Sequence, residues 1–420
     1  MTALLSLPRT PASLPETAVR ADEPVALLQL DATDAIEAAS AVYREVRRGR
    51  RVVAVASGDA DAPARLIAAL DAIGVDAVSP SQGEALLTAA VSVVPGPATA
   101  PRETPRPEKV LRVALAGCGV VGGGVLERLL RDARFEVVGV LVRNPDRARQ
   151  TAIPAGLALT DPAALLAREP DVLVEAISDA STGLALIRAA LTRGVDVVSA
   201  NKQAVGGDLP ALTALAASTG ARLLYSASVG GGAPLIETVR RAKAHGPVVR
   251  IEAVLNGTCN FILNRLADGV AFDEALNAAQ KAGFAEEDPT ADLSGQDAAA
   301  KLAILAHEAL DGGLSPDRIG RDILSAVTIP DGKRVRQVSS LDVRSGHVGV
   351  AFLDADGDPL FANLADEWNA LRVTTEDGRN FIAKGRGAGR LPTTTSVWAD
   401  LSELVTITDC AGAARRRTSA

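Results

Sequence analysis

The sequence predicts an α/β fold: a Rossmann-type doubly wound parallel sheet, a second α+β region after it, and a small α/β unit before it. Hydrophobic residues form 47% of the 420 residues but aromatic residues only 3%, so we expect a core of alanine, valine, leucine and isoleucine, as is typical of α/β proteins. Strand patterns alternate with helical patterns between residues 110 and 245, and this alternation predicts a parallel sheet. The length alone predicts two or three domains.

We expect six segments, and a proline-rich stretch marks the clearest border between them. Prolines 95, 97, 101, 105 and 107 are typical of an extended linker. The predicted order is a small α/β segment at 1–94, the linker at 95–109, a Rossmann domain at 110–245, a second domain for substrate binding and dimerisation at 246–384, a glycine loop with a helix returning to the Rossmann domain at 385–405, and a tail at 406–420.

Composition excludes several classes of function. The net charge of −7 argues against a nucleic-acid partner, because no basic excess is present to neutralise phosphates. The sequence contains no run of 18 apolar residues and no basic-then-apolar leader, so we expect no membrane partner and a cytoplasmic location. Cys118, Cys259 and Cys410 stand far apart, which predicts neither a zinc site nor a disulfide framework.

The N-terminal segment is expected to alternate strands with helices. Apolar Ile36, Ala39, Tyr43 and Val46 recur at helical spacing. The expected elements are strands at 25–30 and 51–56 and helices at 34–48, 61–73 and 83–94.

The clearest local signal is a glycine-rich turn between a strand at 110–115 and a helix that continues to about residue 132. Gly117, Gly119 and Gly122 fit the spacing GxGxxG in the structural context that dinucleotide binding requires. The first glycine permits a tight turn, the second lets the backbone approach a pyrophosphate, and the third allows close packing of helix on strand. The turn therefore predicts a dinucleotide at the N-terminus of this helix.

The next strand, at 135–142, is followed by Arg143, at the position where NAD-specific folds place an acidic residue for the ribose hydroxyl. An arginine there suits a 2′-phosphate, so the sequence favours NADP, with NAD as the alternative. The competing interpretation is that Arg143, Arg147 and Arg149 only decorate a solvated turn.

Strands at 171–176, 196–199 and 222–225, with helices at 182–193 and 209–218, complete the expected sheet. Ligands bind beyond the carboxyl ends of such strands, and two loops stand there. Lys202 ends the first loop and is a candidate for stabilising charge in the crevice. The glycine-rich stretch 228–234 forms the second loop and opens a helix to about residue 244.

The second domain contains an isolated charged pair. Asp297 and Lys301 stand four residues apart, so they share one face of a helix that is expected to begin at Ser294 or Gly295. Lys301 is the only charge between Ala298 and Ala306, and a lysine among apolar side chains can donate or accept a proton. The alternative is an ordinary ion pair on a solvated face. Around this helix we expect strands at 250–255, 348–353, 369–374 and 380–384, a polar turn at 256–260, and helices at 261–266 and 395–404.

Taken together, the motifs of residues 110–405 resemble homoserine dehydrogenase. The resemblance implies reversible, NAD(P)H-dependent reduction of L-aspartate 4-semialdehyde to L-homoserine, a precursor of threonine and methionine, by a homodimer or larger homo-oligomer. Seven motifs stand in the family's order: Gly117–Gly122, Ala200–Lys202, Ser228–Gly232, Asn256–Asn260, Glu286–Asp292, Asp297–Lys301 and Gly385–Gly389.

The same resemblance implies roles for single residues. Lys301 is implied as the proton donor to the nascent alkoxide, Lys202 as the second catalytic lysine, and Asp297 as their partner. Glu286, Asp292 and Asp297 are implied to hold the substrate's ammonium group or to orient the lysines. Cofactor contacts are implied for Gly117, Gly119, Val120, Val121, Gly122, Arg143, Ser199, Lys202 and Gly387.

The sequence departs from the family pattern in three places. Ser226 replaces a glutamate that helps to coordinate a monovalent cation such as sodium, so a metal site at the Val229 and Gly231 carbonyls lacks its usual carboxylate. Arg390 follows Gly389 where another glycine is common. We also expect no C-terminal regulatory domain and therefore no threonine inhibition through one.

The N-terminal segment resembles the beginning of an aspartate kinase that has lost its phosphate loop. Residues 28–34 contain neither the lysine nor the paired glycines that would hold ATP phosphates, so we expect a non-catalytic remnant. Two alternatives to a homoserine dehydrogenase stay open: a non-catalytic NADP-binding regulatory paralogue, and a related amino-acid dehydrogenase.

Overall fold

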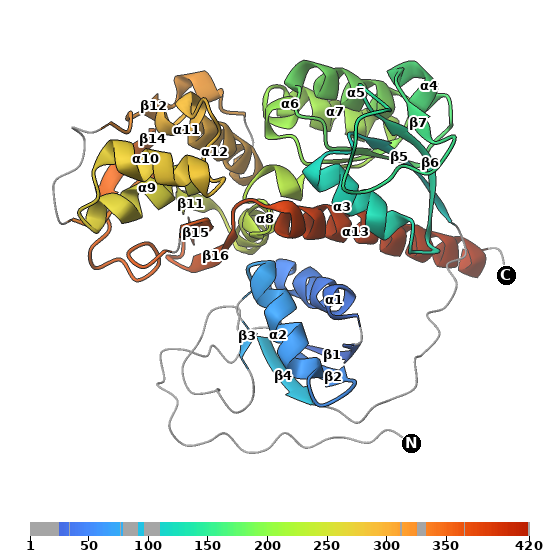
Figure 1. Cartoon of the computed structure of the whole chain (residues 1–420), viewed down its shortest axis with the longest axis horizontal. Helices are drawn as coiled ribbons and strands as arrows, with labels where there is room; N and C mark the ends of the chain where they lie inside the picture. Colours follow the sequence, from blue (N-terminus) through green and yellow to red (C-terminus); the bar gives the residue numbers. More distant parts are fainter. Residues whose placement is uncertain are drawn as a thin grey trace. The chain divides into compact units, whose positions relative to one another are not determined.

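The computed structural model describes residues 25–32, 34–75, 77–78, 91–95, 110–310, 313–325, 333–364 and 366–418. It divides into two compact units, one of Met1–Asp71 with Val75–Ala100 and one of Ala72–Gly74 with Pro101–Ala420. Figure 1 shows both units, coloured along the chain from blue to red. The predicted linker at 95–109 lies almost entirely outside the described residues.

The described residues of the first unit form a parallel sheet in the order β1-β2-β4-β3, with the helices α1 and α2. The predicted helical spacing is correct at three of its four positions: α1 buries Ala39, Tyr43 and Val46, whereas Ile36 in its first turn is exposed. The prediction of a helix at 83–94 is wrong at its end: residues 91–95 form a strand, since three of these five residues are β-branched valines; the rest of that stretch lies outside the described residues. The elements are β1 Val25–Asp31, α1 Ala35–Arg47, β2 Arg51–Ser57, α2 Ala62–Ala72, β3 Ala77–Val78 and β4 Val91–Pro95.

The second unit begins with a parallel sheet in the order β10-β9-β8-β5-β6-β7. This is the doubly wound order. Strands are added in one direction from β5 to β7 and in the opposite direction from β8 to β10, and ligands bind beyond the carboxyl ends of the strands where the order switches, between β5 and β8. The strands are β5 Leu111–Ala116, β6 Phe135–Leu141, β7 Ala158–Leu159, β8 Val172–Glu175, β9 Asp196–Ser199 and β10 Leu223–Leu224. The helices between them are α3 Val120–Leu129, α4 Pro162–Leu166, α5 Ala180–Thr192, α6 Lys202–Gly206 and α7 Leu209–Thr219, and α8 Leu235–His245 follows.

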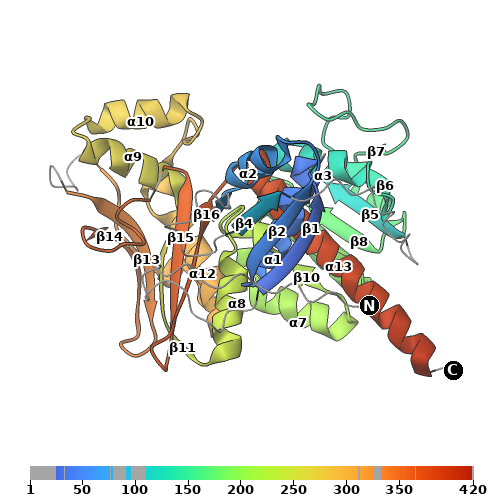
Figure 2. The same ribbon diagram turned by 90° about the horizontal axis from the view of Figure 1, so that it is seen from below.

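A helix near the end of the sequence covers part of one face of this sheet. Helix α13 (Arg390–Thr418) packs with α3 against one face of the sheet, where Trp398 meets the Phe135 ring edge-on at 5.3 Å between centroids. Figure 2 shows α13 passing along this part of the unit. The predicted helix at 395–404 is therefore too short, and the predicted tail at 406–420 is wrong up to Thr418. Alanine and arginine, which favour helix, dominate residues 411–417 and continue it.

The remainder of the unit is a mixed sheet in the order β12-β14-β13-β11-β15-β16, antiparallel except for β12 with β14. Strand β13 was not predicted, because buried Arg336, Gln337 and Ser339 interrupt its apolar pattern. The predicted polar turn at 256–260 is largely the first turn of a helix. The strands are β11 Val248–Val254, β12 Gly320–Arg321, β13 Val335–Asp342, β14 His347–Asp354, β15 Trp368–Thr375 and β16 Asn380–Arg386, and the helices are α9 Gly257–Ala267, α10 Phe272–Lys281, α11 Thr290–Leu293 and α12 Gln296–Ala309.

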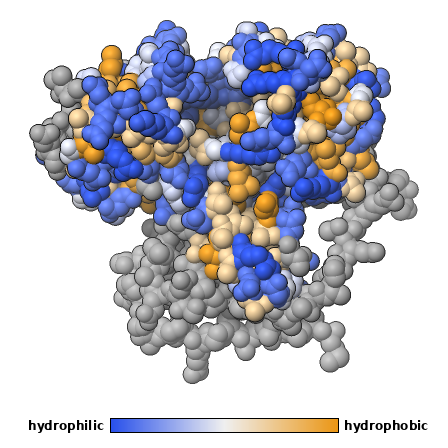
Figure 3. Space-filling model, viewed as in Figure 1, coloured by the Kyte–Doolittle hydropathy of each residue, from blue (hydrophilic) through white to orange (hydrophobic). Residues whose placement is uncertain are grey.

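A single apolar cluster joins the two sheets of the second unit. It runs from α5 and α7 through α8 and α12 to β11, with Leu186, Ile236, Leu302 and Ile251 all buried. Helix α12 therefore packs against elements of both sheets at once. Hydrophilic residues cover much of the face of this unit that Figure 3 shows. Among the described residues, no helix is both long and apolar enough to cross a membrane.

Candidate active site

Three charged side chains from different parts of the second unit meet at one point. Lys301 Nζ lies 2.8 Å from Asp297 Oδ2, and Lys202 Nζ contacts the other carboxylate oxygen, Oδ1. Lys301 also donates a hydrogen bond to the Leu255 carbonyl oxygen at 2.7 Å. We call Lys202, Asp297 and Lys301 the lysine–aspartate cluster.

Local structure explains how each member reaches the cluster. Gly295, at φ +70°, provides the left-handed turn from which α12 starts. Asp297 then lies in the first turn of α12 and Lys301 one turn later, as the i,i+4 spacing predicts. Lys202 begins α6, whose N-terminus is capped by the Asn201 side chain. The cluster therefore forms where α6, which follows β9 of the parallel sheet, meets α12, which packs against the mixed sheet.

Burial and charge are distributed unevenly over the cluster. The Asp297 side chain is 4% exposed, Lys301 is 11% exposed and Lys202 is 35% exposed. Burial alone would raise the pKa of the Asp297 carboxyl, but the charges of Lys301 and Lys202 outweigh it and hold that pKa well below its usual range. One carboxylate thus lies beneath two ammonium groups. The side of the cluster that faces solvent is formed mainly by Lys202.

A second carboxylate lies beside the cluster. Asp292 accepts hydrogen bonds from Asn256 Nδ2 at 2.7 Å and Thr258 Oγ1 at 2.9 Å. Asn256 Nδ2 also lies 2.8 Å from Asp297 Oδ2, so one amide group connects the two carboxylates. The structure therefore brings Asp292 and Asp297 together. Asn256 and Thr258 belong to a predicted motif, but no role was predicted for either residue.

Glu286 is placed differently. It lies on the exposed loop between α10 and α11, and the hydrogen bond at this residue is one that its backbone carbonyl accepts from Gln280. Its carboxylate takes no part in the network around Asp292 and Asp297. The prediction that Glu286 binds substrate stays untested by this geometry.

The glycine turn after β5 has the shape that a dinucleotide requires. Gly117 lies at φ +93°, and a side chain there would meet the Ala176 carbonyl oxygen at 2.5 Å. A side chain on Gly119 would meet no atom within 4 Å, whereas one on Gly122 would meet the Gly117 carbonyl oxygen at 2.0 Å. The turn thus packs tightly at its first and last glycines and is open at its middle one, at the N-terminus of α3. Val120, on the same open side, is 60% exposed, and Val121 is partly buried.

The other predicted cofactor residues divide into two groups. Arg143 is exposed just after β6 and interacts electrostatically with Asp179, while Arg149 donates to the backbone carbonyls of Pro145 and Arg147 in its own loop. Ser199 is fully buried, and its hydroxyl donates to Glu175 at 2.6 Å. Ser199 therefore belongs to the interior of the protein and not to the open crevice.

Two glycine loops from distant parts of the chain lie against each other. The Gly232 N–H donates to the Arg386 carbonyl oxygen at 3.0 Å, and a side chain on Gly231 would meet the Gly387 carbonyl oxygen at 2.6 Å. Gly387 also lies so close to Asn369 that a side chain would meet its amide at 2.4 Å. Glycine at position 231 thus lets the two backbones approach, and glycine at position 387 leaves room for the Asn369 amide.

Ser226, at the position where the family pattern has a glutamate, bonds to a carboxylate of α13. The Ser226 hydroxyl donates to Asp400 Oδ1 at 2.9 Å and its N–H to Oδ2 at 3.2 Å. The polar group at position 226 is thus engaged with α13. Over the part of the chain that the structure describes, no group of three or more His, Cys, Asp or Glu residues gathers as metal ligands would. Val229 and Gly231 offer only their carbonyls.

Arg390, a second departure from the family pattern, fixes the start of α13. Its guanidinium lies 3.2 Å from Thr151 Oγ1 and 3.4 Å from Glu127 Oε2, and contacts Gln150. The arginine therefore anchors α13 to α3 and to the loop after β6.

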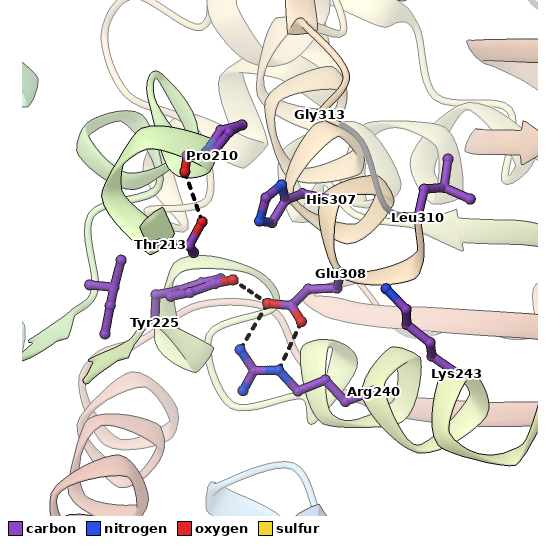
Figure 4. A pocket seen from close by; sticks show the side chains of 10 residues that line it. Pro210, Thr213, Tyr225, Arg240, Lys243, His307, Glu308, Leu310 and Gly313 are labelled. Atoms are coloured by element: carbon purple, nitrogen blue, oxygen red, sulfur yellow. Dashed lines mark hydrogen bonds and ion pairs between the residues drawn. The ribbon is translucent and has the colours of Figure 1, made fainter. Parts of the chain in front are cut away.

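A separate cavity of about 530 Å³ lies at the other end of α12 (Figure 4). There Glu308 accepts hydrogen bonds from Arg240 at 2.8 and 2.9 Å and from the Tyr225 hydroxyl. Neither lysine of the cluster lines this cavity. The carboxylate is already paired, so this group ties α12 to α8 and to the end of the parallel sheet.

Comparison with known proteins identifies the family. Residues 117–226 match the NAD binding domain of homoserine dehydrogenase, and residues 234–402 match the homoserine dehydrogenase domain. The homoserine dehydrogenase of Synechocystis is 32% identical over 322 residues, which cover 71% of this chain and 74% of that protein. The NAD(+)-dependent homoserine dehydrogenase of Pseudomonas canavaninivorans is 32% identical over 55% of this chain and 70% of its own. The crystal structure of a homoserine dehydrogenase from Thiobacillus denitrificans aligns with a TM-score of 0.65 and 31% identity, covering 71% of this chain and 74% of that one.

The fold and these matches first define a class: an oxidoreductase that uses a nicotinamide dinucleotide and acts on a CH–OH group. The sequence identity of 32% to the Synechocystis enzyme, over 71% of this chain and 74% of that protein, also identifies the family. The chain belongs to the homoserine dehydrogenase family. The resemblance predicted for residues 110–405 is thereby confirmed. The family models match from residue 117 onward, so the aspartate-kinase resemblance of the N-terminal segment stays a prediction.

Proposed function

We propose that this chain catalyses the reversible reduction of L-aspartate 4-semialdehyde to L-homoserine with NAD(P)H. The observation that carries the proposal is the lysine–aspartate cluster, in which Lys301 is held by Asp297 at 2.8 Å and by the Leu255 carbonyl at 2.7 Å. Reduction of an aldehyde requires a positioned proton donor at the carbonyl oxygen. Two ammonium groups over one buried carboxylate supply such a donor.

Each cluster residue has a proposed role. When bound, the reduced nicotinamide supplies a hydride to the carbonyl carbon. The Lys301 ammonium donates its proton to the oxygen that would otherwise become an alkoxide, and solvent reprotonates the neutral amine. Lys202 stabilises the negative charge that develops on the same oxygen. Asp297 fixes both side chains, so that little reorganisation is needed during the reaction.

The amino-acid end of the substrate needs an acceptor for its ammonium group. Asp292 fits this role, because Asn256 and Thr258 already hold its carboxylate in a fixed orientation beside the cluster. Glu286, on the neighbouring exposed loop, is the second proposed contact. A carboxylate that is oriented in advance binds an ammonium group without losing further side-chain entropy.

NADP is the proposed cofactor, with pyrophosphate at Gly119 and the N-terminus of α3. Arg143 supports this preference, because it is exposed at the end of β6, where the ribose 2′ position of a dinucleotide lies in this fold. The relative from Pseudomonas canavaninivorans is described as NAD(+)-dependent, so the preference is a property of each chain and must be measured.

The proposal is tested by following NADPH oxidation with L-aspartate 4-semialdehyde for the wild type and for Lys301→Ala. We expect kcat to fall by roughly 10²- to 10⁴-fold, the usual contribution of a positioned proton donor. Lys281→Ala, at the exposed end of α10, is the matched control and should keep wild-type kcat. The role of Lys301 is wrong if its alanine variant turns over normally, and the whole proposal is wrong if folded wild type binds NADPH but oxidises none.

We also propose three properties of the chain beyond the reaction itself. The first unit has no kinase activity, because the Asp34 carboxylate already accepts from the Ile36 and Glu37 N–H groups at the N-terminus of α1, where a phosphate would bind. The chain forms a homodimer through its mixed sheet, measurable by light scattering. The enzyme is cytoplasmic, in keeping with the free buried thiols of Cys118 and Cys259.

A further inference from the structure

Glu175, the last residue of β8, is a buried acid whose hydrogen-bond partners among the described residues are all neutral. Its side chain is 0% exposed. Oε2 accepts from the Ser199 hydroxyl at 2.6 Å, and Oε1 accepts from the Ile177 N–H at 2.9 Å and from Asn201 Nδ2 at 3.3 Å. All three donors are neutral. Burial raises the pKa of the Glu175 carboxyl, and the three hydrogen bonds offset this only in part. An acid in such a place is costly to the fold, so its presence suggests a function.

The hydrogen bonds of Glu175 lead to Lys202 through one residue. Asn201 donates from Nδ2 to Glu175 and, at 3.0 Å, to the Ile177 carbonyl oxygen. The Asn201 Oδ1 atom accepts from the Ala204 N–H at 3.1 Å and thereby caps α6. Because the amide bonds to Glu175 and the Ile177 carbonyl at one end and to α6 at the other, the acid helps to determine which way the amide points. Lys202 is the first residue of that helix.

Helix α5 packs against this network of hydrogen bonds at Gly183. A side chain on Gly183 would meet Asn201 Nδ2 at 2.8 Å and Glu175 Oε1 at 2.9 Å. Both atoms are the ends of flexible side chains, but the added methyl group would also meet Ala204 Cβ on α6 at 3.1 Å, so it would disturb the network and press on α6 together. Gly183 thus provides a way to disturb the hydrogen bonds of Glu175 without changing any charge.

We propose that Glu175 is a positioning residue for the reaction: through Asn201 it holds the turn that presents Lys202 to Asp297 and to the substrate oxygen. The inference rests on the role proposed above for Lys202. It assigns a function to a residue that touches neither lysine. It also explains why Ser199 is buried, since its hydroxyl serves Glu175 and accepts from the Asn201 N–H at 3.1 Å.

A double-mutant cycle of Glu175→Gln with Lys202→Ala tests the proposal on the full chain. Glutamine keeps the shape of the side chain but turns an N–H₂ group toward donors. We expect Glu175→Gln to lower kcat by about 10- to 100-fold, the usual result of misplacing a catalytic group, and to leave the Kd of NADPH within about twofold. In the Lys202→Ala background the same change should lower kcat by less than about threefold, because the residue that it positions is gone. Asp171→Asn, at the other end of β8, is the matched control and should behave as wild type.

Each result decides between the alternatives. If Glu175→Gln lowers kcat equally in both backgrounds, or not at all, Glu175 does not act through Lys202 and the inference is wrong. If Lys202→Ala itself has wild-type kcat, the inference also fails, although the dehydrogenase activity stands. An inactive wild type refutes the proposed function instead. If Glu175→Gln does not fold, Gly183→Ala replaces it in the same cycle with the same expectations.

Discussion

The strongest single test of the site is Asp297→Asn, because this substitution removes the only negative charge between two ammonium groups. The asparagine amide has nearly the same shape, so the cavity stays filled. Two hydrogen-bonded ion pairs are lost, one of them to a lysine that is only 11% exposed. Removing one partner of a buried pair costs about 3–5 kcal/mol, and the repulsion between Lys202 and Lys301 adds to that cost.

Two measurements follow from this. By thermal unfolding at neutral pH, a loss of this size should lower the Tm by several degrees, and kcat should fall by at least about 100-fold because neither lysine is held in place. Glu287→Gln, an exposed carboxylate on the preceding loop, should change neither quantity measurably.

The destabilisation caused by Asp297→Asn should depend on pH. Lys301 and Lys202 hold the pKa of Asp297 below its unfolded value despite burial, so this carboxylate stabilises the folded state above the unfolded pKa near 3.8 and loses that contribution as the pH falls through the lower, folded pKa. The difference in Tm between wild type and Asp297→Asn should therefore be full at pH 7 and shrink below about pH 4. A variant with wild-type Tm and kcat at pH 7 would refute the assignment of Asp297 as the centre of the cluster.

Three further predictions concern other parts of the enzyme. Arg143→Ala should raise the KM for NADPH about tenfold or more while changing that for NADH less than about twofold, because one phosphate contact is lost; equal changes would remove Arg143 from the 2′ position. Glu308→Gln should lower the Tm by a few degrees, since it weakens the contacts with Arg240 and Tyr225 that tie α12 in place, and a kcat loss as large as that of Lys301→Ala would contradict its structural role. Replacing sodium and potassium in the assay by tetramethylammonium should leave kcat within about twofold, because Ser226 bonds to Asp400 and no carboxylate of position 226 serves a cation; strict dependence on one ion would show a site built from other groups.

The features that could be predicted from the sequence are those that local spacing encodes. The pair of Asp297 and Lys301 follows from one helical turn, and the glycine turn at 117–122 follows from its place between a strand and a helix. The contact between Lys202 and Asp297 joins residues 95 positions apart (297 less 202). No periodicity encodes such a contact, and only the family resemblance suggested that the two residues act together.

The features that could not be predicted share a physical cause, which is buried polarity. Strand β13 contains Arg336, at 0% exposure, whose guanidinium donates to the carbonyls of Phe361 and Ala362. Its tertiary partners satisfy groups that in the sequence argue for an exposed segment. Glu175 was missed for the same reason. A glutamate at the end of an apolar strand is expected at the surface, and only the structure shows the three hydrogen-bond donors that surround its carboxylate.

Packing between two helices sets the geometry on which the proposed chemistry depends. Lys202 lies on α6 and Lys301 on α12, so the separation of their ammonium groups depends on how closely these helices approach. At the contact stands Gly206, where a side chain would meet Ile304 Cδ1 at 3.2 Å and Cγ1 at 3.3 Å. A larger residue would push α6 away from α12 and pull Lys202 from Asp297, although it would alter no charge. The cluster is therefore as much a product of this glycine and isoleucine as of the two lysines, and a site assembled from two sheets works only while their shared core holds them together.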